Sequence, residues 1–264
     1  AQADLVNMFV TQEHAVKVIY TTHSPACLPP DLGAGIRTVV PRRDNFQISD
    51  VKNSFWQGSA GYSPLMLAMG AGAAAFTPAR CVVLAEGATE MILLPTLIRT
   101  ATGLSNLPYQ VAPGLSEAPK DFYSKLDFEA AKVAYLVDGD SGGRNLRKAL
   151  TKAGVPERLI VTLDVPGTEN VLGFEAYRAA VTALLPECNP DLSPDVIPEF
   201  AELGNDASRS EAVSTWCDQH TVQSPSKIAV ANWLVENGKA QPSASGSAKL
   251  IALHEAMIEV FSLG

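Results

Sequence analysis

The stretch KVAYLVDGDSGGRN (132–145) joins an apolar run to two aspartates, Asp138 and Asp140, which glycines separate and follow. The apolar run has the composition of a buried strand, and helical periodicity follows at 143–154. A strand that passes through a glycine-rich turn into a helix is typical of parallel sheets with helical connections. Ligands of such sheets bind beyond the carboxyl ends of the strands, which is where the two aspartates stand.

The same alternation of strand and helix continues on both sides of this stretch. Apolar runs predict strands at 79–87, 109–114, 132–140 and 158–167. Periodicity and glycine stops predict helices at 89–103, 120–131, 143–154 and 174–185. After residue 186 the chain is predicted to be helical, with loops at 186–195 and 238–248. The fold class is therefore α/β, a Rossmann-like parallel-sheet core followed by a helical C-terminal subdomain.

The segment before this sheet is less regular. Residues 15–22 and 35–42 are rich in β-branched side chains and predict two further strands. The apolar stretch SPLMLAMGAGAAAFTPA (63–79) is short for a bilayer crossing and carries two prolines and two glycines. We therefore expect it to form a buried helix, and we expect no membrane partner.

The composition is that of a globular protein, with 47% hydrophobic and 18% charged residues among 264. The formal net charge of −8 means that a nucleic-acid partner must meet a local basic surface or a bound metal. The four cysteines form no CxxC pair, so neither a zinc site nor a disulfide framework is expected. With no amino-terminal signal pattern, a reducing cytoplasm is the expected location.

Acidic residues mark the ends of two predicted strands. Glu86 ends one strand and Glu90 falls in the first turn of the next helix, while Asp138 and Asp140 end another strand, where the period of two points both to one side. Adjacent parallel strands would bring the four carboxylates into one crevice, where their mutual repulsion favours a divalent cation. Mg²⁺ and Mn²⁺ prefer such oxygen ligands. The alternative is that the acids are solvated and cap strands and helices.

Three motifs together resemble a known family. EGATE (86–90), followed by the DGDSGG element within 135–143, resembles the TOPRIM domain of topoisomerases, primases and related nucleases. The upstream TTHSP (21–25) resembles the switch-histidine loop of ATPases of the ABC and SMC type. In this order they resemble the OLD (overcoming lysogenization defect) family, in which an ABC-like ATPase precedes a TOPRIM nuclease. The resemblance covers roughly residues 15–185.

The resemblance implies a division of the chain. Residues 1–62 would be the C-terminal remnant of an ABC-type ATPase domain with a connector, 63–185 the TOPRIM catalytic core, and 186–264 a helical subdomain that completes the nuclease. His23 would sense the γ-phosphate of ATP only in an intact ATPase. Because the sequence contains no GxxxxGK[ST] loop, we expect this chain to be part of a larger protein and not to hydrolyse ATP by itself.

The resemblance also implies Mg²⁺- or Mn²⁺-dependent cleavage of DNA. Glu86, Asp138 and Asp140 would hold one or two ions, and Glu90 would help with the second. A further acid follows the last core strand in such nucleases, for which Glu169 is the first choice and Asp164 the weaker one. Glu169 could instead cap the next helix. The family tends to place two acids in succession there, whereas this chain continues with Asn170, which leaves the second ligand open.

Basic residues supply further candidates. Some OLD-like nucleases place a lysine near the scissile phosphate, and Lys227, at the start of a predicted helix, resembles it. The alternative is a solvated surface lysine. Arg144, Arg147 and Lys148, just after the aspartates, could hold the DNA backbone or form a solvated helix face.

A metal-dependent DNA nuclease is thus the leading hypothesis, and the resemblance alone implies a role in defence against phage. One alternative keeps fold and metal but changes the reaction to that of a topoisomerase or primase, although no tyrosine or nucleotide-binding motif supports either. The other is a regulatory or dimerisation module whose metal is structural. The helical region 196–264 can serve either as a homodimer surface or as a DNA clamp.

Overall fold

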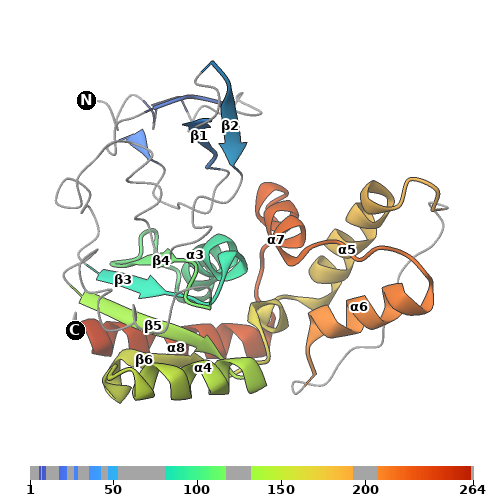
Figure 1. The fold of residues 1–264 in the computed structure, drawn as a ribbon. Coiled ribbons are helices and arrows are strands. Elements are labelled where there is room, and N and C mark those ends of the chain that lie inside the picture. Colours follow the sequence, from blue (N-terminus) through green and yellow to red (C-terminus); the bar gives the residue numbers. More distant parts are fainter. Residues whose placement is uncertain are drawn as a thin grey trace.

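The computed structural model describes residues 81–116, 132–192 and 207–262, together with short stretches between residues 6 and 52. His23 and the predicted helices at 63–79 and 120–131 lie outside the described residues. The described part is a mixed α/β structure with a four-stranded parallel sheet and six α-helices, α3 to α8 (Figure 1). None of the described helices is long and apolar enough to span a bilayer.

The sheet confirms the predicted parallel core. Its strands are β3 (Cys81–Leu84), β4 (Gln110–Ala112), β5 (Lys132–Asp138) and β6 (Ile160–Leu163). They lie in the order β4-β3-β5-β6, and every neighbouring pair is parallel. All residues of β3 and the middle of β5 are buried, which is why both read as continuous apolar runs in the sequence.

The connections run outward from the middle of the sheet. Helix α3 (Ala88–Thr102) leads from β3 to the edge strand β4, and α4 (Ser141–Lys152) leads from β5 to the opposite edge strand β6. Right-handed crossovers in opposite directions place α3 and α4 on opposite faces of the sheet. The loops after β3 and β5 therefore diverge, and a crevice opens at this topological switch point. The acidic residues stand at these two strand ends.

The C-terminal helices pack on the core. They are α5 (Phe174–Cys188), α6 (Arg209–Gln219), α7 (Lys227–Glu236) and α8 (Ala244–Phe261). Helix α8 lies against α3, β5 and β6, and α7 lies between α3 and α5 (Figure 1). Leu97 of α3, Leu136 of β5 and Phe261 of α8 are all fully buried in one apolar cluster. The helical region thus covers apolar surface that α3 would otherwise expose.

Three predicted elements differ from the structure. Residues 18–22 of the predicted strand at 15–22 form no strand. The predicted loop at 186–195 begins only after Cys188, because α5 continues through Pro186 in its last turn. The predicted loop at 238–248 is confirmed for residues 238–243 but is too long, since α8 begins at Ala244 and is capped by Ser243. Small polar residues favour loops locally, but this cap and the burial of α8 override that preference.

The remaining upstream prediction is confirmed in part. Residues 38–41 of the predicted strand at 35–42 form β1 (Thr38–Pro41), which pairs antiparallel with β2 (Ser49–Lys52). The second strand was not predicted from the sequence.

Candidate functional site

Two acids from neighbouring strands meet at the crevice. Asp138 is the last residue of β5, and Glu86 follows β3 at the start of the turn into α3. The Asp138 backbone N–H donates to Glu86 Oε1 at 2.9 Å. The parallel pairing of β3 with β5 therefore brings together two carboxyl groups that stand 52 residues apart in the sequence.

Glu90 lies in the first turn of α3 and points back toward the same crevice. Its Oε2 accepts a hydrogen bond from the Gly87 N–H at 2.9 Å, and its Oε1 accepts one from the Thr168 hydroxyl at 3.2 Å. A glutamate that accepts from the residue before the helix satisfies one of the free N–H groups at the helix start. The side chain is buried, so its charge is not well solvated.

Glu169 brings the fourth carboxylate from the far side of the crevice. It lies in the 3₁₀ turn η5 (Thr168–Val171), which follows β6, and it is only 3% exposed. Its Oε1 is buried and accepts no hydrogen bond. The Lys227 ammonium lies nearby, with its Nζ 4.0 Å from this oxygen. A buried carboxylate oxygen without a hydrogen bond is costly and calls for another positively charged partner.

The electrostatics of the cluster follow from crowding and burial. Burial, followed by the charges of Glu90, Glu86 and Glu169, raises the pKa of Asp138 to about 9. Burial also raises the pKa of Glu86 and of Glu90, and the Glu169 charge adds to the effect on Glu90. Without a metal, Asp138 is therefore protonated at neutral pH. A divalent cation between the carboxylates would reverse these shifts and release that proton.

Asp140 follows the end of β5 and begins the next helix. Strand β5 ends at Asp138, and Asp140, whose backbone is still extended, is the N-cap of α4, where its Oδ1 accepts from the Gly143 N–H at 2.7 Å. One oxygen of the predicted ligand Asp140 is therefore used as a helix cap. The Asp140 charge nevertheless contributes to the raised pKa of Asp138 and of Glu86, so it lies within electrostatic reach of the cluster.

The remaining predicted residues differ in whether they lie at the acidic cluster. Lys227 is the first residue of α7, and its side chain is 58% exposed at the rim of the cluster. Asp164 is 96% exposed and lies 3.5 Å from the ammonium of Lys249, so Glu169 is the acid after β6 that joins the cluster. Asn170 points the other way, since its Nδ2 donates to the Ala207 carbonyl at 2.7 Å.

Two residues of the site were missed from the sequence. Thr168 is fully buried and donates to Glu90, and Arg209, at the start of α6, is also buried. The Arg209 Nη1 donates to the carbonyl oxygens of Glu169 at 3.0 Å and Leu172 at 2.7 Å, which fixes the turn that carries Glu169. The position of Thr168 next to Glu169 could have indicated its role from the sequence. Nothing in the sequence around Arg209, 40 residues after Glu169, indicates that it contacts the site.

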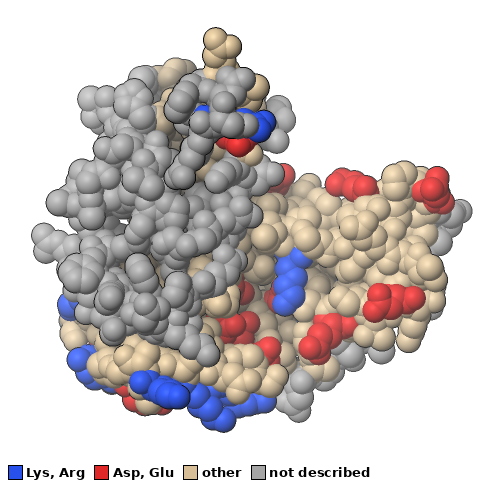
Figure 2. All heavy atoms as spheres, in the orientation of Figure 1, with Lys and Arg blue, Asp and Glu red and all other residues tan. Residues whose placement is uncertain are grey.

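The cluster suits a hard cation, although the described side chains are not arranged as a ready-made metal site. No group of three or more His, Cys, Asp or Glu in the described residues has that arrangement. One oxygen of Glu86 and both oxygens of Glu90 accept hydrogen bonds. The buried Glu169 oxygen that accepts no hydrogen bond and the crowding of carboxyl groups around Asp138 would both be relieved by a hard cation such as Mg²⁺ or Mn²⁺. Figure 2 shows acidic groups gathered in the hollow beside the C-terminal helices.

Comparison with models of protein families, with curated proteins and with solved structures found no match for this chain.

Proposed function

We propose that the protein is a metal-dependent DNA nuclease with a TOPRIM core of the OLD type. The observation that carries the proposal is the convergence of Glu86, Glu90, Asp138 and Glu169 at the switch point of the sheet, with one Glu169 oxygen buried and unbonded. Burial, followed by the charges of the neighbouring carboxylates, raises the pKa of Asp138 to about 9, and such strong perturbation in a crevice supports a functional site. The motifs EGATE and DGDSGG, which first suggested this activity, supply three of these four acids.

The proposed roles follow from the position of each group. Asp138, Glu86 and Glu169 are the residues that would hold Mg²⁺ or Mn²⁺, and Glu90 and Asp140 would add negative charge around them. When bound, such an ion polarises the phosphate and makes water a better nucleophile. Thr168 keeps Glu90 in place through its hydroxyl hydrogen bond.

Lys227 is suited to a role on the substrate side. Its ammonium is near enough to Glu169 to interact electrostatically with the acidic cluster, yet more than half of the side chain is exposed. It can therefore reach an incoming phosphate without leaving the rim of the site. A cation in that position would stabilise the negative charge that develops on the phosphate during cleavage.

A plasmid-nicking assay tests the proposal. We expect the chain to convert supercoiled DNA to nicked or linear forms with Mn²⁺ or Mg²⁺ but not with EDTA. Asp138→Asn should abolish the activity. Asp164→Asn removes an equivalent but exposed carboxylate after β6 and should leave the activity unchanged.

Two results would overturn the proposal. Metal binding without cleavage of any DNA form would favour the non-catalytic metal-binding module. Equal activity of wild type and Asp138→Asn would show that the cleavage comes from a contaminant.

A further inference from the structure

One segment of this acidic protein is strongly basic. Residues 141–159, which include α4 and the turn η4 (Glu157–Leu159), contain five Lys or Arg residues and one acid, whereas the whole chain has a net charge of −8. Figure 2 shows Lys and Arg side chains gathered along the lower edge of the molecule, over α4. The segment is thus a local positive surface on a molecule whose overall field repels polyanions.

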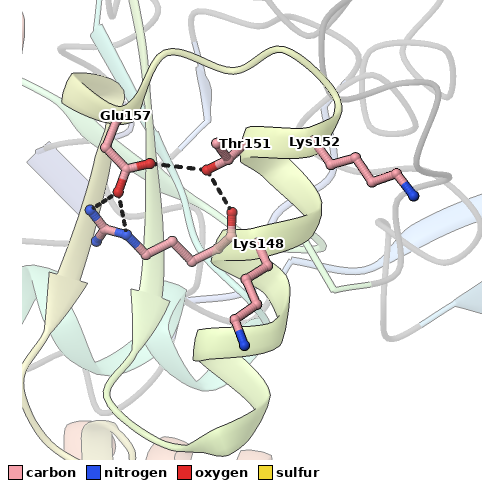
Figure 3. Close-up of a pocket in the computed structure, with 5 residues that line it drawn as sticks. Lys148, Thr151, Lys152 and Glu157 are labelled. Carbon is pink, nitrogen blue, oxygen red and sulfur yellow. Dashed lines mark hydrogen bonds and ion pairs between the residues drawn. The ribbon is translucent and has the colours of Figure 1, made fainter.

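Three of the basic residues form a stripe along α4. Arg144, Lys148 and Lys152 are spaced four residues apart and are all exposed, so they share one outer face of α4. Neither Lys148 nor Lys152 forms an ion pair or hydrogen bond with any described residue. Figure 3 shows their amines pointing away from the nearby acid, Glu157. Their charge is therefore available to a partner.

The fourth basic residue of the helix has a structural role instead. Arg147 donates to Glu157 from Nε at 2.8 Å and to the Thr162 hydroxyl from Nη1 at 2.8 Å. Thr151 also donates to Glu157, at 3.0 Å, which closes the network drawn in Figure 3. This network shapes a groove between α4 and η4 and leaves the two lysines on its edge.

The stripe begins at the acidic crevice. Arg144, in the first turn of α4, donates from Nη1 to the Gly139 carbonyl at 2.8 Å, between Asp138 and Asp140. From there α4 runs away from the strand ends for 12 residues, or about 18 Å. A strand that enters the crevice can therefore continue along this helix.

We infer that the stripe formed by Arg144, Lys148 and Lys152 binds the phosphate backbone of duplex DNA next to the acidic crevice. The inference rests on the proposed function for its choice of polyanion. Residues four apart on a helix are separated by about 6 Å. This is close to the distance between neighbouring phosphates of one strand, which exceeds their rise of about 3.4 Å along the duplex axis because the strand winds around that axis. The three cations can thus meet neighbouring phosphates of one strand.

Salt dependence of binding tests the inference. A labelled duplex is titrated with the 264-residue chain in EDTA, so that no cleavage occurs, between 50 and 200 mM NaCl. Lys148→Gln with Lys152→Gln should reduce the slope of log affinity against log salt by roughly one for each lysine. Arg178→Gln with Lys239→Gln makes the same charge change on α5 and after α7, and should leave the slope as in wild type.

The outcomes separate this inference from the proposed function. The inference that the stripe binds DNA is wrong if the salt-dependence slope is unchanged in the α4 variant, or if it falls equally in both variants. This holds even if the wild type cleaves DNA. A specific reduction supports the stripe even if no metal ever produces cleavage, in which case the nuclease proposal fails instead. If the α4 variant alters the sedimentation mass and not DNA binding, the stripe is a contact between copies of the chain and the inference is wrong.

Discussion

The two halves of the acidic cluster are held in different ways. Glu86 and Asp138 stand at the ends of β3 and β5, and Glu86 and Glu90 accept hydrogen bonds from the backbone N–H groups of Asp138 and Gly87. The turn η5, which carries Glu169, is fixed from outside by α6 and α8. A short motif can therefore encode the first half, whereas the second half exists only when the C-terminal helices are in place.

In each half, a glycine at the start of a helix packs closely against a backbone carbonyl next to an acid of the site. A Cβ at Gly143, at the start of α4, would lie 2.0 Å from the Asp138 carbonyl oxygen. A Cβ at Gly246, at the start of α8, would lie 2.0 Å from the carbonyl oxygen of Val171 in η5. In each case a glycine lets a helix start come into contact with the backbone next to an acid of the site.

The largest expected effect on stability comes from adding a side chain at these two glycines. Gly143→Ala and Gly246→Ala should each cost about 3 kcal/mol or more, because the clash is with backbone that cannot move without displacing an acid. Urea denaturation in EDTA measures the loss. Gly142→Ala is the control, since its Cβ would lie 3.3 Å from the Asp140 side chain, and it should cost far less. Equal stability of all three variants would show that the backbone at the helix starts can shift to accommodate the added methyl group.

A smaller effect, confined to the second half, is expected at Arg209. Arg209→Met removes the donors that hold the carbonyls of Glu169 and Leu172 and should weaken apparent Mn²⁺ affinity about 10- to 100-fold. Mn²⁺ titrations of cleavage, at fixed and saturating DNA, measure this shift.

The conservative variant separates positioning from simple stability. Arg209→Lys keeps one charged donor and should recover part of the Mn²⁺ affinity, and Arg178→Met, on the exposed face of α5, should change nothing. If Arg209→Met lowers thermal stability but leaves the Mn²⁺ dependence of the remaining activity unchanged, Arg209 does not position Glu169.

Asp138, in the first half of the cluster, should make the stability of the protein depend on pH. Asp138 has a pKa of about 9 in the folded protein, above the value of roughly 3.9 for an unfolded chain. The folded state therefore binds its proton more tightly, and this contribution to stability is lost as pH rises from about 4 to 9. Asp138→Asn cannot ionise, so in EDTA at pH 8 it should be more stable than wild type by about 1–2 kcal/mol, or ~2–8 °C in Tm.

Thermal melts at several pH values test this expectation. The advantage of Asp138→Asn should shrink toward pH 5 and should disappear at pH 8 when Mn²⁺ stabilises the wild type. Asp164→Asn, which changes an exposed carboxylate, should follow the wild-type curve. A variant that is less stable than wild type at every pH would mean that the Asp138 carboxylate is not under strain in the metal-free protein.

The same division explains what the sequence could reveal. The buried strands β3 and β5 and the acids at their ends follow from apolar runs and parallel-sheet geometry, so Glu86 and Asp138 were predicted to meet. Arg209 and Thr168 were not predicted, because their roles arise from contacts between segments distant in sequence. The start of α8 was missed because small polar residues read as a loop until the burial of the helix is known.

The smallest effect concerns Asp140, which caps α4 beside the acidic cluster. Its Oδ1 accepts from the Gly143 N–H as the N-cap of α4. Asparagine caps as well as aspartate, so Asp140→Asn should leave the free energy of unfolding in EDTA within about 0.5 kcal/mol of wild type, whereas Asp140→Ala should lose about 1 kcal/mol. Because the Asp140 charge also raises the pKa of Asp138, Asp140→Asn should lower the pH at which Asp138 ionises. Equal losses in the two variants would show that the charge, and not the cap, holds this turn.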